Sequence, residues 1–333
     1  MMEEKVRRWV RADFGVGLAS LDEVPRGAGR DGGAGRLWHG RGEDGAGYAV
    51  RLGAGGPAAG LRAAGQAAAH GVPGVPGPLR DRRGQWWSVR TGRRLSVRPW
   101  VEGVPGGTGP VEPGHWRAFG RLLAAVHATP VPDGLPPARR PGPMADAVRA
   151  VDRWLLRGPG VERHDPLERA LAGLWREMAG PIGALLARAG APPPAAEPGD
   201  PVLCHGDPGP GRLLLGAGAE EVWLLGWSGA VRAPREQDLV AVLELTPDQR
   251  EAFFAGYGPV ELDPGRVEHF RTVRALEELA VPAARVLDRA GLPEPERAAA
   301  LETVRQVLAR TPERADRASA GPSRGARDPS PSG

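Results

Sequence analysis

The stretch Val202-Leu203-Cys204-His205-Gly206-Asp207-Pro208-Gly209-Pro210-Gly211-Arg212-Leu213-Leu214-Leu215 decides how this chain folds. The apolar runs Val202–His205 and Leu213–Leu215 flank a polar loop that is rich in glycine and proline. Short apolar runs bounded by turn residues predict short buried strands. A third such run, Val222–Leu225, follows and ends at Gly226. The sequence therefore predicts a strand, a polar loop and two further strands.

This segment resembles the catalytic loop of the aminoglycoside phosphotransferase and choline kinase family. In that family a His-Gly-Asp loop supplies the catalytic Asp, a later Asn of the loop binds metal, and the following strand ends in a metal-binding Asp. The strand Tyr48-Ala49-Val50-Arg51-Leu52 matches the strand that carries the phosphate-pairing Lys. The resemblance covers about Val6 to Ala309 and implies an α+β, two-lobed protein-kinase-like fold. Its small N-lobe is rich in β-strands and its larger C-lobe is mainly helical.

The resemblance assigns a role to each matching position. Asp207 stands at the catalytic base and Arg51 at the phosphate-pairing Lys. Trp100 and Val101 lie in the stretch that matches the hinge, whose backbone contacts adenine. The helix expected over 58–70 has no acid to fix Arg51, and Gln66 is its nearest polar substitute.

Two further positions have structural roles. His205 is expected to pack and to form hydrogen bonds. Asp238 precedes an apolar helix and is predicted to be its N-cap, while the family position braces the catalytic loop.

The two metal-ligand positions differ from the family pattern. Arg212 stands at the Asn position and Gly226 at the second Asp position. A guanidinium donates hydrogen bonds but accepts none, and glycine has no side chain. Asp207 alone is too little to clamp a metal and its phosphates. The resemblance implies ATP as a ligand, while the residues predict weak magnesium binding or none. Arg51 and Arg212 could instead supply the positive charge, which would permit binding without metal.

Three regions are expected along the chain. Residues 1–101 are expected to form a helix, several strands, a second helix and further strands. This order predicts the nucleotide-covering N-lobe. Residues 102–310 are mainly helical and contain the catalytic-loop-like site. Residues 311–333 contain few apolar residues and are expected to be disordered. The glycine-rich stretch 26–35 is expected to be a flexible loop between two strands.

Bulk composition excludes several classes of function. The 333 residues carry a net charge of +4 without a basic run interleaved with aromatics, so no nucleic-acid groove is predicted. One cysteine excludes an intramolecular disulfide framework. No apolar run reaches the length of a membrane span, and the first residues lack the apolar core of a signal peptide. We therefore expect a cytoplasmic protein that does not contact membranes.

Three functions stay open on the sequence alone. The first is a pseudokinase that binds a nucleotide, another phosphate-bearing ligand or a protein partner. The second is an active ATP-dependent phosphotransferase that phosphorylates a hydroxyl of a small molecule with atypical metal binding. The third is a scaffold subunit without a nucleotide site. Acids and arginines are nearly balanced between residues 141 and 200, so the sequence does not support a polycationic acceptor.

Overall fold

The protein is described from a computed structural model, over residues 2–25, 35–54, 58–109, 111–156, 165–190 and 201–319, with side chains to 309. The chain forms two compact units. Unit 1 comprises Met1–Arg139 and Ala196–Val267, and unit 2 comprises Arg140–Ala195 and Glu268–Gly333. These units are a different division from the two expected lobes, because unit 1 contains the N-lobe sheet together with part of the C-lobe.

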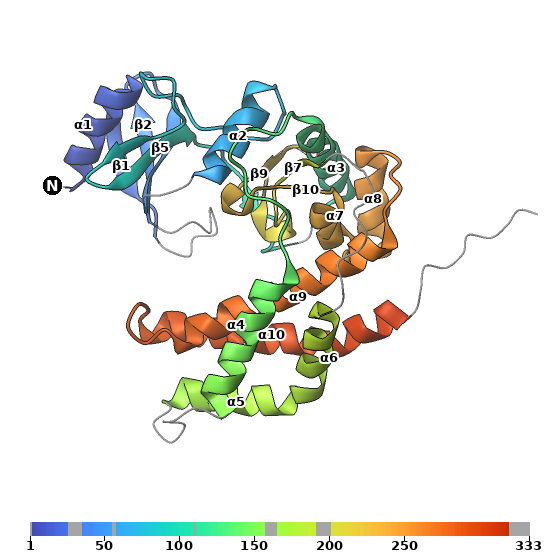
Figure 1. The fold of residues 1–333 in the computed structure, drawn as a ribbon. Coiled ribbons are helices and arrows are strands. Elements are labelled where there is room, and N and C mark those ends of the chain that lie inside the picture. The colour runs from blue at the N-terminus through green and yellow to red at the C-terminus, as the bar shows by residue number, and fades with distance from the viewer. Residues whose placement is uncertain are drawn as a thin grey trace, which may run out of the picture. The chain divides into compact units, whose positions relative to one another are not determined.

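Unit 1 begins with a helix and a five-stranded antiparallel sheet of order β1-β2-β3-β5-β4 (Figure 1). Alternate residues of β3 and β5 point to one face, where Val50, Leu52 and Val97 pack with Val6 and Val10 of α1. The elements are α1 (Met2–Phe14), β1 (Leu18–Glu23), β2 (Arg36–Gly42), β3 (Gly47–Gly53), α2 (Ala59–Ala69), β4 (Ser88–Arg90) and β5 (Arg93–Pro99). The glycine-rich stretch 26–35 lies, except for Gly35, outside the described residues.

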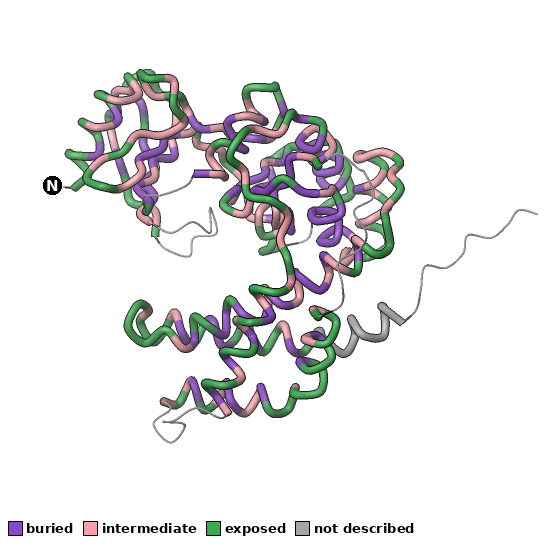
Figure 2. The backbone as a smooth tube through the Cα atoms, viewed as in Figure 1, coloured by how far each residue is buried: buried purple, intermediate pink, exposed green. Residues whose placement is uncertain are grey.

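The rest of unit 1 combines helices with two small sheets, of order β10-β7 and β6-β8-β9. Its core includes Trp116 and Phe119 of α3 and Phe253 of α8, and Figure 2 shows buried residues recurring along α3. The elements are β6 (Val104–Pro105), α3 (Pro113–Ala128), β7 (Val202–Cys204), η2 (Pro210–Arg212), β8 (Leu213–Leu215), β9 (Val222–Leu224), η3 (Trp227–Gly229), β10 (Val231–Ala233), α7 (Glu236–Leu243) and α8 (Pro247–Tyr257).

Glycines set how closely two helices of unit 1 approach. A Cβ added at Gly120 of α3 would lie 2.1 Å from the Phe253 carbonyl oxygen of α8. A Cβ added at Gly256 of α8 would lie 1.9 Å from the Arg117 carbonyl oxygen of α3. Both positions therefore require glycine, because no heavy atom fits between the two backbones at these distances.

Unit 2 is a helical bundle with its own core, which includes Val148, Leu171 and Leu276. A fully buried carboxylate, Glu168, lies in the first turn of α5 and forms a capping box with Asp165. The helices are α4 (Pro141–Leu156), α5 (Pro166–Glu177), α6 (Ala179–Ala189), α9 (Pro264–Leu287), whose first turn belongs to unit 1, and α10 (Glu294–Ser319).

The structure confirms the α+β fold with a small antiparallel N-lobe sheet and a helical C-lobe. Helix α10 continues to Ser319, so the disorder expected from Thr311 is wrong as far as that residue. Glu, Arg and Ala in this segment are good helix formers although few residues are apolar. Residues 320–333 lie outside the described part. No helix in the described residues is both long enough and apolar enough to cross a bilayer.

Candidate functional site

The loop that carries Asp207 is held by a buried carboxylate. Asp238, 0% exposed in α7, accepts hydrogen bonds from the backbone N–H of His205 and of Gly206, both at 2.7 Å. Gly206 has φ +89°, and a Cβ there would lie 2.0 Å from the Gly229 carbonyl oxygen. The N-cap interpretation of Asp238 is wrong, because α7 begins at Glu236 and its N-cap is Arg235. Asp238 instead points away from its helix and satisfies two amides of the loop.

His205 joins this loop to the end of β9. Its buried Nε2 donates to the Leu225 carbonyl oxygen at 2.9 Å, and its Nδ1 accepts from the Asp207 backbone N–H at 3.3 Å. One nitrogen donates and the other accepts, which is the pattern of a neutral imidazole. Burial lowers the pKa of His205 and so favours the same neutral form. The ring therefore positions Asp207 and offers no nitrogen to a ligand.

Arg212 is paired with Asp207. Its Nε and Nη2 donate to Oδ2 of Asp207 at 3.1 and 2.9 Å. Strand pairing also places Arg212 beside Gly226, because Leu213 is opposite Leu224 and the Leu225 N–H donates to the Arg212 carbonyl oxygen at 2.9 Å. The two positions that the sequence analysis matched to metal ligands therefore lie side by side.

Arg212 and Gly226 offer no side-chain oxygen to a divalent metal. Gly226 is in the left-handed region with φ +78°, and a Cβ there would lie 2.9 Å from Cδ of Arg212. The stem of Arg212 thus fills the place where a side chain at position 226 would begin. Magnesium prefers several oxygen ligands, whereas Asp207 is the only carboxylate of the three expected positions and one of its oxygens accepts from Arg212.

An arginine-lined cavity of about 460 Å³ adjoins Gly226. The sheet contributes Ala49, Arg51 and Gly53 from β3 and Arg94, Ser96 and Arg98 from β5, alternate residues on the face opposite Val50 and Leu95. Helix α2 contributes Leu61 and Ala64, and the segment 224–228 closes another side. Three arginines therefore project toward one space, and no described residue that lines it is acidic. Partial burial lowers the pKa of Arg94, because a cation is less stable away from water.

Some of the positions named from the sequence line this cavity and others do not. Arg51 and Gly226 line it, and Arg212 with Asp207 lies next to Gly226. Trp100 and Val101 are not among its lining residues. The indole of Trp100 stacks on His39 at 4.1 Å and donates to Glu102, and its backbone N–H donates to the Gly47 carbonyl oxygen at 2.9 Å. That amide is therefore used within the sheet.

One more position, Gln66, differs in its surroundings from what the sequence suggests. Gln66, expected near Arg51, lies outside the lining of this cavity, and its Nε2 donates to the Pro130 carbonyl oxygen at 3.3 Å. Sequence reasoning missed Arg94 and Arg98. The signal was present, because polar and apolar residues alternate through Arg94-Leu95-Ser96-Val97-Arg98.

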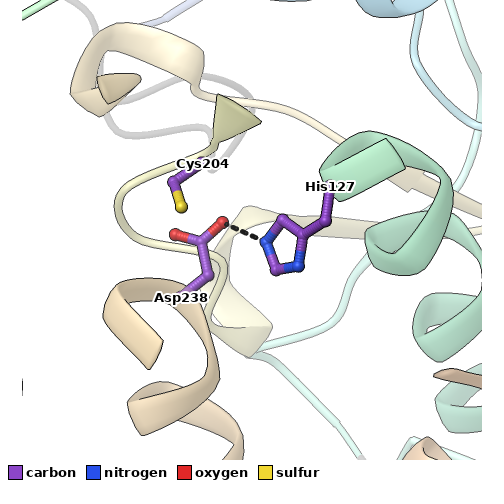
Figure 3. Close-up of side chains that lie close together, drawn as sticks. All are labelled: His127, Cys204 and Asp238. Carbon is purple, nitrogen blue, oxygen red and sulfur yellow. Dashed lines mark hydrogen bonds and ion pairs between the residues drawn. The ribbon is translucent and has the colours of Figure 1, made fainter. Parts of the chain in front are cut away.

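A second buried cluster lies beneath the loop, formed by His127, Cys204 and Asp238 (Figure 3). Potential ligand atoms of the three lie within 4.8 Å of one another, which is close enough for one ion. The atoms of His127 and Asp238 are already used. The Tyr257 hydroxyl and Nδ1 of His127 are 2.7 Å apart, and Nε2 of His127 and Asp238 Oδ2 are 3.2 Å apart.

The cysteine of this cluster is unsuited to a metal as well. Burial raises the pKa of the Cys204 thiol well above its ordinary value, so the thiolate that binds metals is disfavoured. Burial likewise raises the pKa of Tyr257 to about 12. A hydroxyl that stays protonated can donate to Nδ1, which leaves Nε2–H of His127 to donate to Asp238. We assign the cluster to the support of the Asp207 loop.

The comparisons with known proteins agree with this architecture. Spectinomycin phosphotransferase APH(9)-Ia in complex with ADP and spectinomycin matches with a TM-score of 0.79 at 18% identity, covering 92% of this chain and 97% of that chain. A putative aminoglycoside phosphotransferase from Ralstonia eutropha matches with a TM-score of 0.62 at 13% identity, over 94% and 98% of the two chains.

A kinase structure with a bound ATP analogue is also similar. Amicoumacin kinase hAmiN in complex with AMP-PNP, Ca²⁺ and Ami matches with a TM-score of 0.57 at 12% identity, over 93% of this chain and 94% of that chain. At these identities the likeness shows the fold alone. A search of curated proteins finds no match. The model of the phosphotransferase enzyme family matches residues 38–274, and the chain therefore belongs to that family.

Proposed function

We propose that this protein is a pseudokinase that binds a phosphate-bearing ligand of the nucleotide type without a divalent metal. The observation that carries the proposal is the position of Arg212, whose guanidinium bonds to Asp207 and whose stem lies against Gly226. A cation stands where the family holds a metal. Phosphoryl transfer depends on metal ions for much of its charge neutralisation, and neither Arg212 nor Gly226 has a side-chain oxygen to hold such an ion.

The charge of the arginine-lined cavity supports the choice of ligand. Arg51, Arg94 and Arg98 line it, and their planar guanidinium groups suit bidentate pairing with phosphate oxygens. Arg94 is half-buried, and an anion bound near it would offset part of its loss of water. Two similar structures contain ADP or AMP-PNP, which makes a nucleotide the first ligand to test.

A second candidate is an active phosphotransferase with atypical metal binding. The braced loop favours it, because Asp238 and His205 hold Asp207 as an intact catalytic loop requires. Against it, an acceptor hydroxyl would compete with Arg212 for an oxygen of Asp207. The two functions differ in their dependence on magnesium.

The test is a thermal-shift and calorimetric titration of the full chain with ADP and ATP, in EDTA and in magnesium. We expect equal stabilisation in both conditions, about 2.7 kcal/mol at a hundred times the dissociation constant. Arg51→Gln and Arg98→Gln should each weaken binding about tenfold or more, because each removes a charge-assisted hydrogen bond. Arg41→Gln is the matched control, since Arg41 is exposed on β2 and does not line the cavity.

The other outcomes each favour a different function. Stabilisation or ATP consumption only in magnesium would establish the active phosphotransferase and overturn the proposal. No response in either condition would favour a scaffold without a nucleotide site. Equal nucleotide binding by Arg212→Ala and the parent would show that Arg212 does not replace the metal charge.

A further inference from the structure

A second pocket lies on a different face of α2 from the arginine-lined cavity. Its volume is about 410 Å³, within the range of small-molecule sites. Arg62 and Gln66 of α2 line this pocket, whereas Leu61 and Ala64 of the same helix line the arginine-lined cavity. We call it the tryptophan pocket, after Trp86 and Trp87 in its wall. No part of the proposed nucleotide site lines it.

One wall of the tryptophan pocket is a turn held by its own hydrogen bonds. Oδ1 of Asp81 accepts from the backbone N–H of Arg83 at 2.9 Å and of Gln85 at 2.8 Å. The Arg82 N–H donates to the Asp13 carbonyl oxygen at 2.8 Å, which ties the turn to the end of α1. Nη1 of Arg80 donates to the Gly84 carbonyl oxygen at 2.7 Å. The turn therefore fixes the position of the Arg80 guanidinium.

Two arginines of this pocket lie over tryptophan rings. The Arg80 guanidinium is 3.7 Å from the Trp86 ring centroid, and that of Arg62 is 5.4 Å from the Trp87 ring centroid. Trp86 packs against α2 at Gly65, where an added Cβ would lie 2.5 Å from the ring. A stacked guanidinium presents its N–H edges to a ligand while its face is covered. The Trp86 ring and the bond to Gly84 therefore orient the Arg80 guanidinium before any ligand binds, while Arg62 lies over Trp87 at a longer distance.

The charges of the tryptophan pocket favour an anion. Within the described residues, neither Arg62 nor Arg80 forms an ion pair. The acid that lines the pocket, Asp133, is exposed and makes no ion pair with either arginine in that part of the chain. Two guanidinium groups near one space match the oxygens of a carboxylate or phosphate bidentately.

We infer that the tryptophan pocket is a second ligand site, which takes a small organic oxyanion, a carboxylate or a phosphate ester, on Arg62 and Arg80. The inference does not depend on the proposed nucleotide binding, because the two sites share no lining residue. Asp133 gives the site an acceptor for a hydroxyl or amino group of the same ligand, which would favour a hydroxy acid or an amino acid over a bare anion.

The experiment titrates citrate and, separately, inorganic phosphate into the full chain at constant ionic strength, by calorimetry and tryptophan fluorescence. We expect saturable citrate binding by the parent and by Arg51→Gln, since Arg51 lies in the other cavity. The double variant Arg62→Gln/Arg80→Gln should bind at least tenfold more weakly. The control Arg82→Gln/Arg83→Gln removes the same charge from the same turn without touching the pocket lining, and should bind as the parent does.

The outcomes separate the alternatives. Equal weakening in the control variant would show attraction by net charge alone and would overturn the site, as would an absence of saturable binding by the parent. Loss of binding in Arg51→Gln with retention in Arg62→Gln/Arg80→Gln would place the anion in the arginine-lined cavity and also overturn the inference. Binding of phosphate but not citrate would identify the ligand as a phosphate ester. Arg62→Lys/Arg80→Lys keeps the charge, so weaker binding by this variant would support recognition by the stacked guanidinium groups.

Discussion

At the scale of single residues, Arg212 and Gly226 fit each other. The stem of Arg212 lies where a side chain at position 226 would begin, and its head pairs with Asp207. Arg212 and Gly226, which both differ from the family pattern, therefore depend on each other for space. A side chain at 226 would collide with Arg212, whereas Arg212 needs the space that glycine leaves.

We therefore expect Gly226→Asp and Arg212→Asn to be strongly non-additive. Gly226→Asp alone should destabilise the protein by about 1–3 kcal/mol, through the left-handed backbone and the contact with Arg212. Adding Arg212→Asn removes that contact, so the double variant should regain stability and bind nucleotide more tightly in magnesium than in EDTA. Urea unfolding and calorimetry of the parent, both single variants and the double variant measure these effects. Additive stabilities together with unchanged binding in magnesium would contradict the expected pairing of the two positions.

At the scale of elements, helix α5 is joined to the α9–α10 region by a cluster of charges. Arg289 pairs with the fully buried Glu168, and Arg297 with Asp165 at 2.6 Å. Burial alone would raise the pKa of both carboxyl groups. Hydrogen bonds from Arg289 to Glu168, and from the Glu168 amide and Arg297 to Asp165, outweigh burial and lower both pKa values.

This cluster should make unit 2 sensitive to acid. A carboxyl group with a lowered pKa stabilises the fold above its unfolded-state pKa, and the stability is lost as pH falls through the folded-state pKa. We expect the free energy of unfolding to drop below about pH 4, where ordinary carboxyl groups take up protons. Glu168→Gln should be less stable at neutral pH and should show a smaller drop. Denaturant unfolding between pH 7 and pH 3 gives both the stability at neutral pH and its decrease in acid. Glu302→Gln is the control, because Glu302 forms an exposed ion pair with Arg305. If the free energy of unfolding falls with pH equally in Glu168→Gln and in the parent, this carboxylate does not contribute to the acid sensitivity.

At the scale of the whole molecule, the two units have separate apolar cores. Leu95 belongs to the core of the sheet in unit 1 and Leu171 to the core of unit 2, and both are 0% exposed. A separate core allows a unit to unfold on its own.

Leu171→Ala and Leu95→Ala should therefore affect different unfolding transitions. Each removes buried methyl groups, at a cost of about 2–5 kcal/mol. We expect Leu171→Ala to lower a transition that ADP does not shift, while Leu95→Ala lowers the transition that ADP raises. Differential scanning calorimetry with and without ADP measures both. A single transition lowered equally by both variants would mean that the units unfold together.

Much of the fold was predictable from the sequence because long helices and alternating strands carry periodic signals. The starts of α8 and α9 are marked in the sequence, because each helix has proline at its first position. Strands β6 and β10 were missed, since runs of two and three residues show no periodicity. They are strands only because β8 and β7, distant in the chain, pair with them. The break between α5 and α6 falls at Met178, while Pro181 lies in the first turn of α6, where proline is tolerated.

The candidate site was predictable where one loop contains it and unpredictable where several elements meet. The pairing of Arg212 with Asp207 follows from short spacing within one loop. The meeting of Arg51 with Arg94 and Arg98 requires the register of β3 against β5. His127, Cys204 and Asp238 are far apart in the chain, with 111 positions between His127 and Asp238. No local sequence pattern therefore predicts the cluster that they form.

The burial of Cys204 allows local opening of the protein to be followed by labelling of its thiol. A thiol-reactive dye can reach this sulfur only when the structure around it opens, because the side chain is 0% exposed. The dye reports on this site alone, because the chain has no other cysteine. The rate of dye incorporation under native conditions therefore counts how often the support of the Asp207 loop opens. A ligand that tightens this region would slow the dye, without any engineered label.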